Sequence, residues 1–213
     1  MGSLPSQPLP ASPYQSRFST PSALKANEFE SSDEEPSEEE QVPFQVSWLA
    51  LSPTYSQFLG ICSLPDELKS YGVQDVFVLC TRGELSKYRV PHLLEAYQSQ
   101  GIAVHHHPIS DGDTPDIAKC CLILKELRSC LEGDRKTLIH CYGGLGRSCL
   151  IAACLLLQIS DTIGPQQAID SLRDLRGSGA IQTIKQYNYL HDFQQTLAVH
   201  LATEGATARS VSR

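Results

Sequence analysis

The sequence has no apolar run long enough to cross a membrane. Within its 213 residues an uninterrupted apolar stretch occurs at 150–157, whereas a membrane-spanning helix needs about 20 apolar residues. The opening residues, MGSLPSQPLP, lack the apolar core of a secretory signal. A weak match to a myristoylation site, Gly2 followed by Ser6, stays open. We otherwise expect no membrane partner.

The sequence also lacks an excess of basic residues. Its formal net charge is −7, which argues against general binding to nucleic acid. Residues 1–43 hold eight acidic and two basic residues, are rich in Ser and Pro, and contain few large apolar side chains. Such a segment cannot bury enough surface to offset the entropy that it loses on ordering. We predict a disordered acidic tail over residues 1–43 and one folded domain over residues 44–213.

No CxxC pair occurs among the eight cysteines, so the sequence predicts neither a structural zinc site nor a disulfide framework. All except Cys141 lie in apolar or helical stretches and are interpreted as buried free thiols of a reducing compartment. The histidines at 105–107 alternate between the two faces of a strand, and no acid, cysteine and histidine set stands at a workable spacing. We therefore expect no metal and no cofactor.

Short apolar runs alternate with helical patterns along the folded part. Strands are predicted at residues 46–52, 58–61, 75–80, 102–107 and 137–141. Helices are predicted at residues 88–100, 115–132, 146–160, 165–176 and 183–202, the second of them with Thr114 as N-cap and Pro115 in its first position. This alternation predicts an α/β fold with a central, mainly parallel sheet flanked by helices. Ligands of such sheets bind beyond the carboxyl ends of the strands.

The most informative segment follows the last strand, where residues 140–148 read HCYGGLGRS. Three glycines allow the backbone N–H groups to converge on one point, and the helix that follows adds positive potential. The same field stabilises a thiolate at Cys141, which would lie beneath a bound phosphate as a nucleophile. Ser148 can donate a hydrogen bond to the departing sulfur. The predicted phosphate-binding residues are Tyr142, Gly143, Gly144, Leu145, Gly146 and the bidentate Arg147.

This segment resembles the HCxxGxxR[ST] signature of the cysteine-dependent protein tyrosine phosphatase superfamily, in its dual-specificity branch. Residues 79–91, 105–118 and 171–190, with the acidic SSDEEP at 31–36, are similar to the family of kinase-associated phosphatases. The resemblance covers nearly all of residues 28–213. It implies the protein tyrosine phosphatase fold, a phosphocysteine intermediate and activity on both phosphoserine/threonine and phosphotyrosine.

A carboxylic acid must protonate the leaving oxygen in such a reaction. The candidates are Asp111, Asp113 and Asp116, which all follow the strand predicted at 102–107. Asp111 is preferred, because it stands in the family's Pro-Ile-x-Asp-Gly arrangement. Asp113 is the alternative acid, and Asp116 is assigned to the first helical turn, where an acid is favoured.

Other residues are expected to shape the site rather than to react. His140 is expected to order the loop by hydrogen bonding, and Tyr142 to shape the mouth of the pocket. Lys185 and Gln186 are placed at the pocket rim, where Gln186 could help to position water. Because Tyr142 and Leu145 bring no extra positive charge into the loop, a single phosphate on a protein is the expected substrate.

The resemblance implies a function and a partner. The partner is a phosphorylated cyclin-dependent kinase. The protein would remove the phosphate from the activation-segment threonine of this kinase and would thereby restrain cell-cycle progression. It also implies a monomer with a cytoplasmic, perinuclear location. The alternative is a non-catalytic module that holds the kinase and inhibits it. Cys141, Arg147, Ser148 and Asp111 are all present, which favours the enzyme.

The sequence departs from this family in one place. Relatives carry a longer basic stretch between the Leu-Pro turn and the helix that begins ELKS. Here Leu64 and Pro65 run directly into residues 66–70. We therefore expect that helix to be reduced to a stub of one or two turns before the strand at 75–80.

Overall fold

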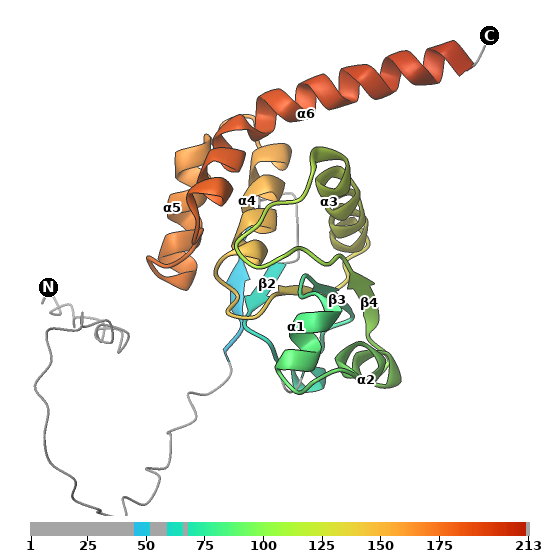
Figure 1. Cartoon of the computed structure of the whole chain (residues 1–213), viewed down its shortest axis with the longest axis vertical. Coiled ribbons are helices and arrows are strands. Elements are labelled where there is room, and N and C mark those ends of the chain that lie inside the picture. Colours follow the sequence, from blue (N-terminus) through green and yellow to red (C-terminus); the bar gives the residue numbers. More distant parts are fainter. Residues whose placement is uncertain (1–44, 52–58, 66–67, 212–213) are drawn as a thin grey trace, which may run out of the picture. The chain divides into compact units, whose positions relative to one another are not determined.

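The computed structural model describes residues 45–51, 59–65 and 68–211, so the predicted tail and residues 52 and 58 of the predicted strands lie outside the described residues. The described residues form a five-stranded sheet with strand order β1-β2-β5-β3-β4 (Figure 1). β1 pairs antiparallel with β2, and the remaining pairs are parallel. The predicted, mainly parallel sheet is confirmed. The strands are β1 Ser47–Leu49, β2 Leu59–Cys62, β3 Asp75–Val78, β4 Ala103–His106 and β5 Thr137–His140.

Helices cover both faces of this sheet. α4 is the central helix, buried over most of its length against β2 and β5, and it lies between α3 and α5 (Figure 1). On the opposite face, α2 packs against β4. The helices are α1 Arg82–Lys87, α2 Leu93–Ser99, α3 Ile117–Glu132, α4 Arg147–Ile159, α5 Pro165–Arg176 and α6 Ile184–Val211, with a 3-10 turn, η1, at Lys69–Tyr71.

The helices predicted at 88–100 and 115–132 begin two or more residues later than expected. The helix predicted at 88–100 is shorter, and a separate helix, α1, precedes it. α1 begins with a capping box, in which Thr81 and Glu84 each bind the other's backbone N–H. It ends before Arg89, which has a positive φ of 63°. The N-cap of α3 is Asp116 and not Thr114, because the Asp116 carboxylate accepts a hydrogen bond from the N–H of Lys119.

The connection between β2 and β3 is unusually short. Both strands pair in parallel with β5, so residues 63–74 must cross over the sheet, a task that usually takes a helix. Among the described residues of this connection only the 3-10 turn η1 is helical, which confirms the predicted stub. Leu68, from this connection, is fully buried. The sheet is therefore covered here by the short connection and by α2.

His140 belongs to the face that α2 covers. It pairs with Val78 in register, and its ring lies edge-on to Tyr97 of α2, with the Tyr97 hydroxyl 3.4 Å from Nε2. Its Nδ1 lies 3.3 Å from the carbonyl oxygen of Cys141, as expected for a residue that orders the loop. Burial lowers the pKa of His140 from 6.5 to about 4. The imidazole is therefore neutral in the folded protein at neutral pH.

This pKa predicts how stability changes with pH. The folded-state pKa of His140 lies below its unfolded value, so its contribution is complete above pH 6.5 and is lost as the pH falls toward about 4. In that interval the unfolded chain binds a proton that the folded protein excludes. The loss in the free energy of unfolding amounts to about 3 kcal/mol.

The measurement is urea denaturation of the wild type and of His140→Gln at a series of pH values. We expect a flatter pH dependence for His140→Gln. The matched control is His191→Gln, because His191 is exposed on α6 and its removal should leave the slope unchanged. Equal slopes for the wild type and His140→Gln would contradict the assignment.

Candidate active site

The loop from Cys141 to Gly146 connects the end of β5 to the start of α4. Its tight course requires glycine at Gly144, and it is closely packed at Gly146. Gly144 has a φ of +67°, and a Cβ there would lie 2.3 Å from the carbonyl oxygen of Cys62. A Cβ at Gly146 would lie 2.6 Å from Oε1 of Gln182. The glycines therefore let the loop lie directly against the end of β2 and the segment before α6.

The loop turns its carbonyl groups toward the protein. The Tyr142 carbonyl oxygen accepts a hydrogen bond from the N–H of Leu64, and the Leu145 carbonyl oxygen accepts one from the N–H of Ile181. The carbonyl oxygens of Gly143 and Gly144 accept from the Arg176 guanidinium. None of the described residues accepts a hydrogen bond from the backbone N–H groups of residues 142–146. A short loop with its N–H groups free and its carbonyls engaged is a cradle for an anion.

Cys141 lies at the start of this loop with only 3% of its surface exposed. Two other buried thiols, those of Cys80 and Cys149, interact with it electrostatically. Burial raises the pKa of Cys80 and of Cys149 to about 12, and Cys141 contributes further to both shifts. These neighbours therefore stay protonated at neutral pH. Cys141 is the thiol that stands at the opening of the anion cradle.

Arg147, the first residue of α4, is 1% exposed and crosses the floor of the site. Its Nη1 and Nη2 donate to the Glu84 carboxylate at 2.9 and 2.7 Å, and Nη1 also donates to the Ile109 carbonyl at 2.9 Å. Its Nε is buried and has no hydrogen-bond partner among the described residues. One edge of the guanidinium is thus fixed by the protein, while a donor remains for a ligand.

Glu84 is a functional residue that the sequence analysis missed. It completes the capping box of α1 and also holds Arg147. Burial acts to raise its pKa, but hydrogen bonds from Arg147 and Thr81 outweigh it, so the pKa of Glu84 is lowered. The capping box itself can be recognised in the sequence as Thr81 with Glu84 three residues later. Nothing in the sequence shows that this carboxylate faces Arg147.

Ser148 supports the assignment made from the sequence. It is fully buried, and its Oγ has no hydrogen-bond partner among the described residues. An unpaired buried hydroxyl is costly. Ser148 follows Arg147 in the first turn of α4, where the positive end of the helix dipole favours an anion. A phosphate or a thiolate at Cys141 would give these unpaired donors a partner.

The structure separates the three candidate acids. The Asp111 side chain is 72% exposed, and its Oδ1 lies 3.0 Å from Nη2 of Arg147, so it reaches the phosphate site. Asp113 instead pairs with Lys185, whose hydrogen bond lowers the pKa of Asp113. A lowered pKa disfavours a proton donor. Asp116 is the N-cap of α3 and so precedes the first turn to which it was assigned, and its side chain accepts a hydrogen bond from the N–H of Lys119.

The start of α6 holds the segment that carries these acids. Thr183 Oγ1 donates a hydrogen bond to the carbonyl oxygen of Gly112 at 2.9 Å. Gln186 Nε2 lies 3.5 Å from the carbonyl oxygen of Asp113. Gln186 is fully buried, and its Oε1 accepts from the N–H of Gln182. Lys185 and Gln186, predicted at the pocket rim, therefore contact the acid segment at residues 112–113.

Tyr142 is an exposed aromatic residue of the loop. Its side chain is 49% exposed, and its ring stacks on that of Tyr88, with centroids 3.9 Å apart. The stacked pair stands next to Cys141 and brings no charge. Because Tyr142 and Leu145 are uncharged, Arg147 is the one cationic residue in residues 141–148.

Comparison with known proteins shows which family this sequence resembles. The sequence model of the family "Cyclin-dependent kinase inhibitor 3" matches residues 18–67 and 65–169. The human and pig proteins named cyclin-dependent kinase inhibitor 3 are each 65% identical over 209 residues, covering 91% of this chain and 99% of the relative. The two matched segments of the family model meet at residues 65–67, where the connection after β2 is short.

A solved structure supports the same relationship. A kinase-associated phosphatase, with its catalytic-site cysteine replaced by serine, superposes with a TM-score of 0.70 at 65% identity, covering 75% of this chain and 98% of that chain. The match in sequence and structure therefore extends over most of both chains. The chain belongs to the cyclin-dependent kinase inhibitor 3 family of kinase-associated phosphatases, within the cysteine-dependent protein tyrosine phosphatase superfamily.

Proposed function

We propose that this protein removes the phosphate from the activation-segment threonine of a cyclin-dependent kinase and thereby restrains the cell cycle. The relatives' names, cyclin-dependent kinase inhibitor and kinase-associated phosphatase, support the choice of partner. The observation that carries the chemistry is the set of unpaired donors around Cys141: the N–H groups of the loop, Nε of Arg147 and Oγ of Ser148. Together they match the oxygens of a phosphoryl group.

In the first step the Cys141 thiolate attacks phosphorus. A sulfur–phosphorus bond forms, and the bond from phosphorus to the threonine oxygen breaks. The loop N–H groups and Arg147 stabilise the charge on the transferring phosphoryl oxygens. The leaving oxygen takes its proton from Asp111, which stands 3.0 Å from the Arg147 guanidinium. The products are a phosphocysteine and the free threonine hydroxyl.

In the second step water attacks the phosphocysteine. Asp111, now ionised, accepts the water proton, and the sulfur–phosphorus bond breaks to release inorganic phosphate. Ser148 donates a hydrogen bond to the departing sulfur, so that the thiolate forms again without a proton of its own. Gln186 acts indirectly, because it is buried against the segment that carries Asp111 and Asp113.

The site is suited to a single phosphate on a protein. Ligands with further phosphates gain from additional cationic side chains inside the loop, and residues 141–148 offer only Arg147. The stacked rings of Tyr88 and Tyr142 give the mouth an apolar wall that a peptide chain can contact. We propose that these rings border the substrate's phosphothreonine or phosphotyrosine.

The proposed setting is a monomer in the cytoplasm, in the perinuclear region. All eight cysteines are free thiols, which is typical of a reducing compartment. No helix in the described part of the chain is long and apolar enough to span a membrane. Nothing in the mechanism requires a second copy, because the residues assigned to it come from one chain.

The proposal is tested by phosphate release from a cyclin-dependent kinase phosphorylated on its activation-segment threonine. We expect turnover by the wild type and none by Cys141→Ser, because the serine hydroxyl is a poor nucleophile at neutral pH. Cys141→Ser should still bind the phosphorylated kinase, since the loop and Arg147 remain. Arg147→Lys should also lose activity, because an ammonium cannot keep the two-atom contact with Glu84 and also offer a donor to the phosphate.

Three outcomes would count against this function. Turnover by Cys141→Ser would exclude the thiol mechanism. Wild-type activity on small aryl phosphates without activity on the phosphorylated kinase would exclude the proposed substrate. Binding and inhibition of the kinase by the wild type with no phosphate release would establish the alternative, a non-catalytic inhibitor.

The role of Asp111 predicts a dependence on the leaving group. We expect Asp111→Asn to slow release from a phosphothreonine peptide by about 10²–10⁴-fold, the usual contribution of general acid catalysis. An aryl phosphate with an acidic leaving group needs no proton, so its hydrolysis should fall far less. The measurement is kcat on both substrates at the same pH.

Asp113→Asn is the matched control for this experiment. Asp113 lies two residues away in the sequence, but its carboxylate is paired with Lys185. We expect Asp113→Asn to change both substrates by a similar, small factor. If Asp113→Asn instead shows the large loss confined to phosphothreonine, the acid is Asp113 and the assignment is wrong.

A further inference from the structure

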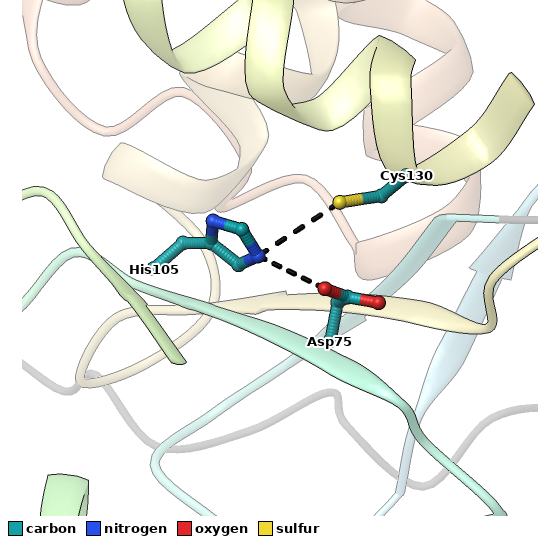
Figure 2. A group of neighbouring side chains, drawn as sticks. All are labelled: Asp75, His105 and Cys130. Carbon is teal, nitrogen blue, oxygen red and sulfur yellow. Dashed lines mark hydrogen bonds and ion pairs between the residues drawn. The ribbon is translucent and has the colours of Figure 1, made fainter. Parts of the chain in front are cut away.

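A cluster of three metal-ligand types lies away from the phosphate loop. Asp75 begins β3, His105 lies on β4 and Cys130 lies near the end of α3. Figure 2 shows the three side chains converging, with His105 between the other two. His105 Nε2 lies 2.9 Å from Asp75 Oδ1 and 3.8 Å from Cys130 Sγ, and all three atoms lie within 4.8 Å of one another. The expectation that no such set forms is therefore not met.

We propose that Asp75, His105 and Cys130 form a binding site for Zn²⁺. An oxygen, a nitrogen and a sulfur ligand together are typical of zinc, which prefers four ligands in tetrahedral arrangement. The three donor atoms need only small shifts to reach the usual Zn–ligand distances of about 2.0–2.3 Å. The His105 side chain is 23% exposed, so solvent can supply the fourth ligand.

The residues around the three ligands resemble the outer shell of a metal site. Glu126 Oε2 lies 3.0 Å from Nδ1 of His105, and this carboxylate–histidine contact directs Nε2 toward the cluster, as in metal sites. Phe77 stacks on the His105 ring with centroids 4.3 Å apart and fixes its plane. Arg135 pairs with Oδ2 of Asp75, which leaves Oδ1 facing His105.

Burial and charge favour a divalent ion. Asp75 is 1% exposed and Cys130 is 7% exposed, so the ligands are largely screened from competing water. The Asp75 carboxylate and a Cys130 thiolate together supply two negative charges for the two positive charges of zinc, and the nearby Arg135 and Glu126 add one charge of each sign. Binding forms one bond from each ligand atom to the ion, and the thiol proton is released to the solvent.

The proposed zinc site is separate from the phosphate site. Asp75 pairs in register with Thr137 at the start of β5, and Cys141 follows the other end of β5. With a rise of about 3.3 Å per residue, Asp75 and Cys141 lie about 13 Å apart along the strands. Bound zinc would link β3, β4 and α3. Its expected effect is therefore on stability, through preferential binding to the folded chain.

The test is a Co²⁺ titration of the full-length protein carrying Cys141→Ser, which removes the loop thiol as a competing ligand. After treatment with a chelator, we expect a single equivalent of Co²⁺ to give a thiolate-to-cobalt band in the near ultraviolet and the visible bands of tetrahedral cobalt. Stoichiometric Zn²⁺ should abolish both. Absence of the thiolate band would overturn the proposal.

Variants in the same background assign the ligands. Adding Cys130→Ser should remove the thiolate band, whereas Cys121→Ser, a half-buried cysteine on the same helix, should leave it unchanged. Glu126→Gln should weaken Zn²⁺ binding by about 10–100-fold, the usual effect of removing an outer-shell partner. A band that survives Cys130→Ser would overturn the assignment.

A second measurement does not depend on the folding of any Cys130 variant. The same Cys141→Ser protein is alkylated with and without Zn²⁺, and each cysteine is followed by mass spectrometry. We expect Zn²⁺ to slow the modification of Cys130 at least tenfold and to leave Cys121 unaffected. Equal rates at Cys130 with and without Zn²⁺ would contradict the proposal.

Discussion

The ion pair between Arg147 and Glu84 is the interaction on which the phosphate site depends. Arg147 is almost fully buried, and the Glu84 side chain is 15% exposed. Burial makes each charge costly without the other, and removing one partner from a buried pair typically costs about 3–5 kcal/mol. The pair joins the first turn of α1 to the first turn of α4. It thereby fixes the plane of the guanidinium before any phosphate arrives, so no reorganisation is needed in the transition state.

Further contacts organise the site around this pair. Asp111 approaches the same guanidinium, and the start of α6 holds the adjacent Gly112 and Asp113. The loop carbonyls are bound on the opposite side by Arg176, Leu64 and Ile181. Three segments that are distant in the sequence thus meet at the carboxyl ends of the parallel strands, the edge where such sheets bind ligands. The Asp75, His105 and Cys130 cluster lies away from this edge and includes the first residue of β3.

Much of the fold and of the loop could be predicted from the sequence, because the signals are local. The strands from β2 onward follow short apolar runs, and α5 begins and ends at the predicted residues. Cys141, Arg147 and Ser148 stand within eight residues of one another, so their spacing and the glycines between them predict an anion cradle directly. The helix predicted at 88–100 begins too early, because Arg89 has a positive φ, and α1, which starts at a capping box, was not predicted.

The sequence by itself determined the α/β architecture and the chemistry of the loop, because backbone geometry, apolar spacing and glycine placement act over a few residues. Only the tertiary structure decided which carboxylates lie beside Arg147. It placed Glu84 against Arg147, turned Asp111 toward the phosphate site and paired Asp113 with Lys185. It also joined His105 to Asp75 and Cys130 across separations of 30 and 25 residues. Strand register and helix packing set these contacts, and neither can be read from local spacing.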